Sequence, residues 1–257
     1  MYNEFMNKKT GHNGIRLWAV GFWLAAWQIA GMLSREHVFF VTPADVMARL
    51  LALAGTPDFW QSAGMSYLRI TSGFLLSVIF GTGLAAAAAA LPRLRELLAP
   101  VMLAIRTIPV VSFVILAIIL VSPRQLAVLI SLTMGLPIMY TNVLDGIGQR
   151  DPELMEMARV FRIPPLRRIR RVDAPLVLPY FRAGLKVSAG LCWKAGAAAE
   201  VIGVPAMSIG LHLYQAKIYI ETADLFAWTL VIVLLSLATE KLVLFLTDCL
   251  AKSQRNW

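Results

Sequence analysis

Three ionisable residues, Arg106, Lys194 and Glu200, are surrounded by apolar residues in this sequence. A charge near the centre of a bilayer costs several kcal/mol unless it is paired or hydrated. Counting about 1.5 Å per residue from Leu97 and Arg182 puts Arg106 and Lys194 roughly 13 and 18 Å into apolar helices. One interpretation is that these groups face a path and favour an anion, with Glu200 closing an outer gate by pairing with a cation. The other, equally weighted, is an interhelical ion pair that holds the helices together.

The composition predicts the elements that position these charges. The chain has 257 residues, of which 58% are hydrophobic and 15% charged, with a mean hydropathy of +0.69. Soluble domains have about 45–50% apolar residues and about 25% charged ones. The net charge of +9 is concentrated in connections between apolar runs, which argues against a nucleic-acid surface. Cys192 and Cys249 lack the spacing of metal ligands, so no metal or cofactor is expected in this chain.

Six apolar runs are long enough, or nearly so, to cross a bilayer. They predict an all-α membrane protein with one domain over residues 17–250, a short N-terminal segment over 1–16 and a tail over 251–257. The six spans are expected at residues 17–33, 73–91, 97–121, 126–144, 181–203 and 225–246. The first run is long and lacks a small-x-small cleavage site, so it is interpreted as a retained helix.

Two further stretches are expected as short surface helices outside the bilayer. Thr42 can cap a helix that begins at Pro43 and continues to Leu53, and residues 59–70 form a second amphipathic stretch that leads into the next span. Basic residues gather in the N-terminal segment, the turn at 92–96, the long connection at 145–179 and the tail. The positive-inside rule therefore predicts that both termini are cytoplasmic.

The connection over residues 145–179 is long for a helical bundle and is predicted to form a helix-turn-helix on the cytoplasmic surface. Its first helix begins at Pro152 and ends before Pro164, and its second covers residues 166–172. The apolar residues of the first helix repeat at helical spacing: Leu154, Met157, Ala158 and Phe161. Such a stripe fits a groove on a soluble partner or, with equal weight, a surface of anionic membrane lipid.

The same connection resembles a known loop. Glu156-Met157-Ala158, Arg162 and Val172-Asp173-Ala174-Pro175 match in register the "E-A-A, three residues, G, nine residues, I-x-L-P" loop of permeases in binding-protein-dependent ABC importers. The resemblance implies that the ATPase is contacted by Glu156, Met157, Ala158, Phe161, Arg162 and Pro175. Glycine at position 162 would turn through positive φ without cost, so arginine predicts a different turn there, with Pro164-Pro165 making the bend.

Other stretches are similar to the branch of that family that imports nitrate, sulfonate, taurine, bicarbonate and thiamine precursors. These are residues 105–109, 198–203 and 224–227, and the likeness extends over most of residues 40–245. It implies a type I, methionine-importer-like fold in the bacterial inner membrane and a second permease copy, forming a homodimer. It also implies two cytoplasmic ATPase subunits that bind ATP and Mg²⁺, and an external substrate-binding protein.

The expected function is a permease that carries a small anionic or organic solute when ATPase closure draws two loop helices together. The chain is not expected to be an enzyme, because it lacks the phosphate-binding pattern G-x-x-x-x-G-K-[ST]. An ion-coupled secondary transporter, with Glu200 and Lys194 as the ion site, is the main alternative. A non-transporting scaffold that recruits a soluble protein is a weaker one.

Overall fold

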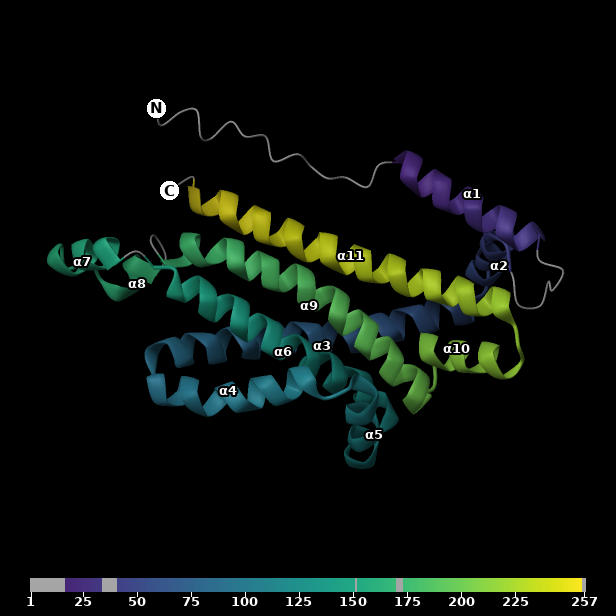
Figure 1. Cartoon of the computed structure of the whole chain (residues 1–257), viewed down its shortest axis with the longest axis horizontal. Helices are drawn as coiled ribbons and strands as arrows, with labels where there is room; N and C mark the ends of the chain where they lie inside the picture. The colour runs from purple at the N-terminus through teal and green to yellow at the C-terminus, as the bar shows by residue number, and fades with distance from the viewer. Residues whose placement is uncertain (1–16, 34–40, 151, 170–172, 256–257) are drawn as a thin grey trace.

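The computed structural model describes residues 17–33, 41–150, 152–169 and 173–255, and over these residues the chain is helical, without strands (Figure 1). The predictions for residues 1–16 and for the end of the tail concern residues outside these ranges. The helices are α1 (Leu17–Leu33), α2 (Pro43–Ala54), α3 (Pro57–Ala90), α4 (Pro92–Thr107), α5 (Val110–Leu120), α6 (Pro123–Gly148), α7 (Pro152–Val160), α8 (Pro165–Arg168), α9 (Ala174–Gly203), α10 (Ile209–Ile218) and α11 (Thr222–Arg255). The predicted all-α class is therefore confirmed.

Helix α6 forms the centre of the bundle and packs along α3 on one side and α9 on the other. Glycines let these backbones approach closely, as in other membrane bundles. A methyl group added at Gly81 of α3 would lie 2.6 Å from Cβ of Met139 on α6, and Gly135 of α6 faces Ser77 and Cys192 in the same way. Gly81 of α3 is thus a contact residue between the two helices.

Replacing Gly81 with alanine is expected to destabilise the bundle by about 1–3 kcal/mol, the usual cost of overfilling a packed contact. Gly83 is a matched control, because a methyl group there meets no atom within 4 Å. Alanine at Gly83 is expected to be neutral or to stabilise by about 0.5–1 kcal/mol through helix propensity. Thermal unfolding of the two purified variants measures the difference, and equal unfolding temperatures would contradict the packing account.

The amphipathic stretch predicted at residues 59–70 is helical, but it is continuous with the span that follows it. Those residues belong to α3, a single helix of 34 residues that is about 51 Å long and exceeds the roughly 30 Å of a bilayer core. Nothing between Ile70 and Gly73 interrupts the backbone hydrogen bonds. Gly73 does not break the helix but lets it touch the backbone of α6 at Val128.

The expected continuous span over residues 97–121 is also corrected. Helices α4 and α5 meet at an angle of 105° around Ile108 and Pro109. Proline has no backbone N–H to continue the helix and disfavours helical geometry in the residue before it; Ile108 accordingly adopts an extended conformation, with φ of −70° and ψ of 129°. The chain therefore turns sharply just after Arg106.

By length and apolar character, three of the described helices are able to cross a membrane, namely α3, α6 and α11. The count rises to four if the bent pair of α4 and α5 is one span, and α1 is a shorter apolar helix. Helix α9 is long enough, with 30 residues, but it is not among these apolar helices. It carries four charged residues: Arg182, Lys186, Lys194 and Glu200. The described residues thus establish a membrane protein with several apolar helices.

The two ends of the bundle carry different small elements (Figure 1). Helices α7 and α8 lie at one end, near the C-terminal end of α11, whereas α2 and α10 lie at the other. The prediction that Thr42 caps α2 is confirmed. The Thr42 hydroxyl accepts a hydrogen bond from the backbone N–H of Asp45, and the Asp45 carboxylate accepts one from the backbone N–H of Thr42. The long helices therefore hold the two groups of small elements far apart.

Candidate functional site

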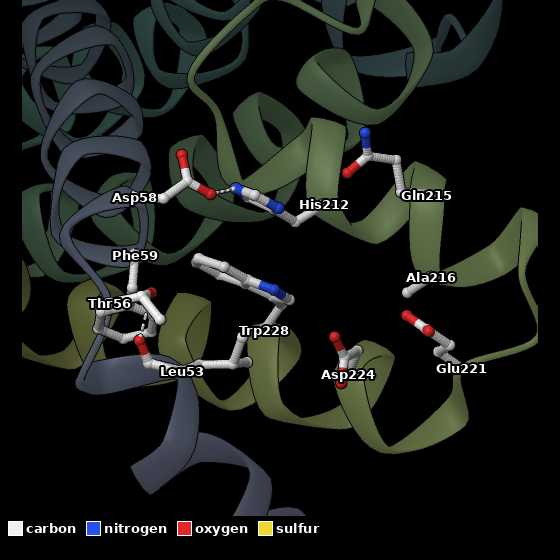
Figure 2. A pocket seen from close by; sticks show the side chains of 10 residues that line it. All are labelled: Leu53, Thr56, Asp58, Phe59, His212, Gln215, Ala216, Glu221, Asp224 and Trp228. Atoms are coloured by element: carbon white, nitrogen blue, oxygen red, sulfur yellow. Dashed lines mark hydrogen bonds and ion pairs between the residues drawn. The ribbon is translucent and has the colours of Figure 1, made fainter.

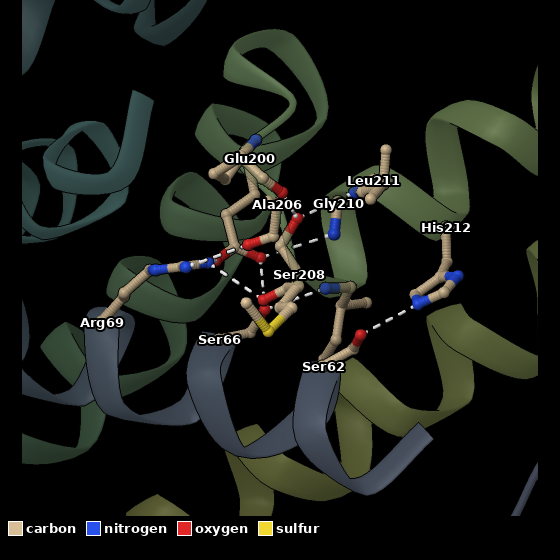
Figure 3. Close-up of polar contacts among 12 residues, drawn as sticks. Ser62, Ser66, Arg69, Glu200, Ala206, Ser208, Gly210, Leu211 and His212 are labelled. Carbon is tan, nitrogen blue, oxygen red and sulfur yellow. Dashed lines mark hydrogen bonds and ion pairs between the residues drawn. The ribbon is translucent and has the colours of Figure 1, made fainter. Parts of the chain in front are cut away.

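The buried carboxylate of Glu200 is the centre of a polar network that joins α3, α9 and α10 (Figure 3). Ser66 donates to Oε2 of Glu200 at 2.5 Å, and Arg69 lies 3.3 Å from Oε1. The backbone N–H of Gly210 also faces this carboxylate, at 3.4 Å. The side chains of Arg69 and Glu200 are 9% and 0% exposed, so both charges are removed from solvent and depend on each other.

The network also fixes the connection between α9 and α10. Arg69 donates to the carbonyls of Ala206 at 3.1 Å and Met207 at 3.2 Å, and Ser66 accepts from the backbone N–H of Ile209 at 2.9 Å. Met207 has a φ of 51°, a conformation that costs a non-glycine residue about 1–2 kcal/mol. The hydrogen bonds from Arg69 thus hold this connection in place despite its backbone strain.

The three charges singled out in the sequence are not brought together. Glu200 lies in the network, whereas Lys194 is exposed on α9, and in the described part of the chain no carboxylate lies within ion-pair distance of Lys194. Arg106 donates to the carbonyl of Pro137 at 3.0 Å and to the Thr141 hydroxyl. An interhelical ion pair, one of the two interpretations left open, therefore exists for Glu200, with Arg69 as its partner.

Sequence reasoning missed Arg69 because the residues around it were interpreted as a surface helix. The signal was nevertheless present. Ser62, Ser66 and Arg69 recur at i, i+4 and i+7 along an otherwise apolar stretch, which places them on one face of a helix. A polar face on a membrane helix turns toward protein rather than lipid.

A second polar feature is a cavity of about 230 Å³ at the end of the bundle that carries α2 and α10 (Figure 2). Its lining residues come from the turn between α2 and α3, from α10 and from the start of α11: Leu53, Thr56, Asp58, Phe59, His212, Gln215, Ala216, Glu221, Asp224 and Trp228. Three of them are acidic and none is lysine or arginine. The lining is therefore acidic, although Arg49 of α2 forms an ion pair with Asp224.

His212 forms one wall of this cavity and stacks on Trp228, with 4.4 Å between ring centroids and 4° between ring planes. Its Nε2 lies 2.9 Å from the Ser62 hydroxyl and 3.3 Å from the Asp58 carboxylate. Burial lowers the pKa of His212, although the charges of Asp58 and Asp224 act in the opposite direction. The imidazole is therefore mainly neutral at pH 7.

At the opposite end, α7 presents apolar side chains to solvent. Met157 is 43% exposed, Val160 71% and Phe161 73%, whereas Ala158 is buried at 3%. Glu156 and Pro175, also predicted as contact residues, are exposed. Part of the predicted second helix lies in α8, and its residues 170–172 lie outside the described residues. Exposed apolar groups on a short amphipathic helix are typical of an interaction surface.

The prediction that Arg162 forces a different turn was wrong. Arg162 adopts a φ of 49°, the left-handed conformation that glycine would supply, and the N–H of Ile163 bonds to the carbonyl of Ala158 at 2.9 Å. This six-residue closure is the Schellman motif that ends many helices. The exposed arginine therefore keeps the glycine-type turn at a conformational cost.

Asp173 attaches this hairpin to the start of α9. Its carboxylate is buried, and its two oxygens lie 3.1 Å from Nε of Arg150 and 3.6 Å from Nε of Arg168. These distances fit ion pairs, but neither contact has the geometry of a hydrogen bond. One acid thus connects the end of α6, helix α8 and helix α9.

Comparison with known proteins identifies similar chains. The family model "Binding-protein-dependent transport system inner membrane component" matches residues 73–256. The "Putative aliphatic sulfonates transport permease protein SsuC" of Bacillus subtilis is 25% identical over 237 residues, covering 91% of this chain and 85% of the relative. The "Bicarbonate transport system permease protein CmpB" of Synechococcus elongatus is 29% identical over 160 residues, covering 62% of this chain but 57% of the relative. A "Probable ABC transporter permease protein" of Haemophilus influenzae is 27% identical over 223 residues, covering 85% of this chain and 89% of the relative.

Proposed function

This chain belongs to the family of binding-protein-dependent transport system inner membrane components, and on that premise we propose how its parts import a solute. The protein is the translocation subunit of an ABC importer, not an enzyme, and ATP with Mg²⁺ is bound by separate ATPase subunits. The bundle crosses the membrane six times, through α1, α3, the bent pair of α4 and α5, α6, α9 and α11. The end with α7 and α8 faces the cytoplasm, and the end with α2 and α10 faces outward.

The orientation is supported by charge. The cytoplasmic end carries the basic turn at Arg93 and Arg95 and the arginines of the α7–α8 hairpin, whereas the cavity at the other end is lined by acids. Basic residues are concentrated on cytoplasmic connections in membrane proteins. Both termini then lie in the cytoplasm.

Coupling to the ATPase is assigned to α7. Met157 and Phe161 insert into a groove on the ATPase, beside Glu156 and Arg162, and Ala158 packs inward. Movement of the hairpin reaches the bundle through Asp173 and its two arginines, next to Pro175 in the first turn of α9. Two ATPase subunits that close on ATP thereby bring two hairpins together and change which side of the path is open.

The proposed path rests on one observation: the ammonium group of Lys194 in α9 is exposed and has no ion-pair partner among the described residues. A lysine facing lipid at this depth is costly, so this face of α9 meets a hydrated path between two copies of the chain. Gly190, one turn earlier, leaves open space beside it. The face is therefore suited to a homodimer with a cationic path at its centre.

Anions are the class of solute that this path favours. Lys194 supplies a positive charge, and Arg106 places a second one at the break between α4 and α5. The names of two relatives specify aliphatic sulfonates and bicarbonate, both anionic, and their shared charge supports the same class for this chain. Glu200 has a structural role in the bundle and does not line the path, because its charge is already compensated by Arg69.

Uptake by proteoliposomes that contain the permease, the ATPase and the binding protein tests this function. Uptake is expected to require ATP and to persist when the proton gradient is dissipated. Methionine at Lys194 is expected to raise the half-saturating anion concentration of substrate-stimulated ATPase activity. Unchanged substrate affinity would remove Lys194 from the path, and uptake that follows the gradient without ATP would favour ion coupling instead.

A further inference from the structure

Lys194 is one member of a series of cationic residues along α9. Arg182, Lys186 and Lys194 are spaced by four and eight residues, with Gly190 at the remaining four-residue step. Residues four apart are neighbours on one side of a helix and differ by about 6 Å in height. Lys186, Gly190 and Lys194 are all exposed, and a methyl group at Gly190 would meet no atom within 4 Å. The two lysines are thus about 12 Å apart along the helix, with open space between them.

Helix α11, which packs against α9 (Figure 1), places acids beside the first two cations. Nη2 of Arg182 lies 2.8 Å from the Asp248 carboxylate, which is the distance of a close ion pair. Nζ of Lys186 lies 3.9 Å from Oε1 of Glu240, and the Lys186 side chain is 66% exposed. The ammonium group of Lys186 is therefore held only loosely by its acid.

Glu240 indicates that this side of the two helices meets water. It lies within the apolar span Thr222–Cys249 of α11, about 13 Å from the Cys249 end at 1.5 Å per residue. A lysine can extend its long stem toward the membrane surface, whereas a glutamate side chain is too short to do so. An ion pair as long as that of Lys186 and Glu240 poorly replaces the water that both charges would lose in lipid. The pair therefore extends the hydrated face that Lys194 marks.

We propose that Lys186 is a second binding station for the transported anion, which displaces Glu240 from the ammonium group on its way from Lys194 to the cytoplasm. The inference rests on the proposed function, which places this face of α9 on the path and the start of α9 at the cytoplasmic end. Glu240 then keeps the station weak, because its carboxylate competes for the same cation and repels the solute. A weak station allows the anion to leave, whereas an unopposed lysine would retain it.

The charge of the station is measured in the assembled importer in lipid nanodiscs, with Gly190→Cys as a reporter in a Cys249→Ser background. Two reagents modify the thiol: 2-sulfonatoethyl methanethiosulfonate, an anion, and 2-(trimethylammonium)ethyl methanethiosulfonate, a cation. The ratio of their rates, divided by the ratio for free 2-mercaptoethanol, cancels the reactivity of the thiol and is expected to be about tenfold or more. Lys186→Met should lower this ratio at least threefold, and Glu240→Gln should raise it at least threefold. Lys241→Met removes an exposed lysine beside Glu240 on α11 and should leave the ratio unchanged.

Binding is measured with the same anionic reagent, which is itself an alkylsulfonate. If it occupies the station before it reacts, its rate of modification at position 190 should saturate with concentration. The half-saturating concentration should fall at least threefold in Glu240→Gln and rise at least threefold in Lys186→Met. A strictly linear dependence on reagent concentration in Glu240→Gln overturns the proposal.

The outcomes separate this station from the path itself. If the ratio falls in Lys194→Met but is unchanged in Lys186→Met, the path stands and the second station is wrong. If neither reagent modifies position 190, although both modify Glu221→Cys at the end of the bundle, this face meets lipid and the proposed path fails. Val187→Cys, at a side chain that is 57% exposed one turn before Gly190, is a second reporter and should rank the variants in the same order.

Discussion

Replacement of Arg69 by methionine is expected to lower the free energy of unfolding by about 3–5 kcal/mol, the usual result of removing one partner of a buried ion pair. The loss is large because the carboxylate of Glu200 would stay buried without its counter-charge, and the carbonyls of Ala206 and Met207 would lose their donor. Chemical denaturation of the purified protein in detergent measures the change.

Two further variants separate the ion pair from general damage. The double variant Arg69→Met/Glu200→Gln removes both charges and should recover a substantial part of the loss, as replaced ion pairs do elsewhere. Arg182→Met removes one member of a pair that is 38% and 47% exposed and should cost at most about 1 kcal/mol. Equal losses in Arg69→Met and Arg182→Met would contradict the central position given to the network.

Replacement of Phe161 by aspartate is expected to uncouple the permease from its ATPase. An exposed aromatic side chain that fills a partner's groove commonly contributes 2 kcal/mol or more to binding, which corresponds to about a 30-fold loss of affinity. Because Phe161 is 73% exposed, the substitution removes no core contact of the isolated chain. Co-purification with the ATPase and substrate-stimulated hydrolysis both measure the effect.

Phe161→Leu is the matched control for this surface, since it keeps an apolar side chain of similar reach and should retain most of the activity. Thermal unfolding of the isolated permease should be the same for both variants. Full ATPase stimulation in Phe161→Asp, at wild-type protein levels, would show that the α7 surface is not the coupling contact. It would instead support the interpretation that this surface contacts anionic membrane lipid.

The apolar runs were sufficient to predict a helical membrane protein and to locate α6, α9 and α11, because long apolar stretches have few other solutions. They were insufficient to predict where a helix breaks and where it continues. The break at Pro109 and the unbroken course of α3 through Gly73 differ from the predictions for one reason. Neither residue type decides a helix boundary by itself: Pro109 lies at a break, Pro137 lies inside α6, and Gly73 of α3 is packed closely against α6.

The candidate site was only partly predictable, because its residues meet across helices far apart in the sequence. Glu200 was recognised as a buried charge, but Arg69 lies 131 positions away and its role depends on a close approach of α3 to α9. Arg162 illustrates the opposite case. There, local bonding of the Schellman type overrides the residue's preference, so the motif's turn survives the loss of its glycine.

The side of the membrane on which each end lies is the most direct test of the account. In a Cys249→Ser background, with Cys192 buried, Phe161→Cys and Glu221→Cys are exposed to a membrane-impermeant maleimide in vesicles of known orientation. The account predicts that position 161 is labelled only in inside-out vesicles and position 221 only in right-side-out vesicles. Labelling of position 161 in right-side-out vesicles would place the α7–α8 hairpin outside the cell and contradict the coupling of this bundle to a cytoplasmic ATPase.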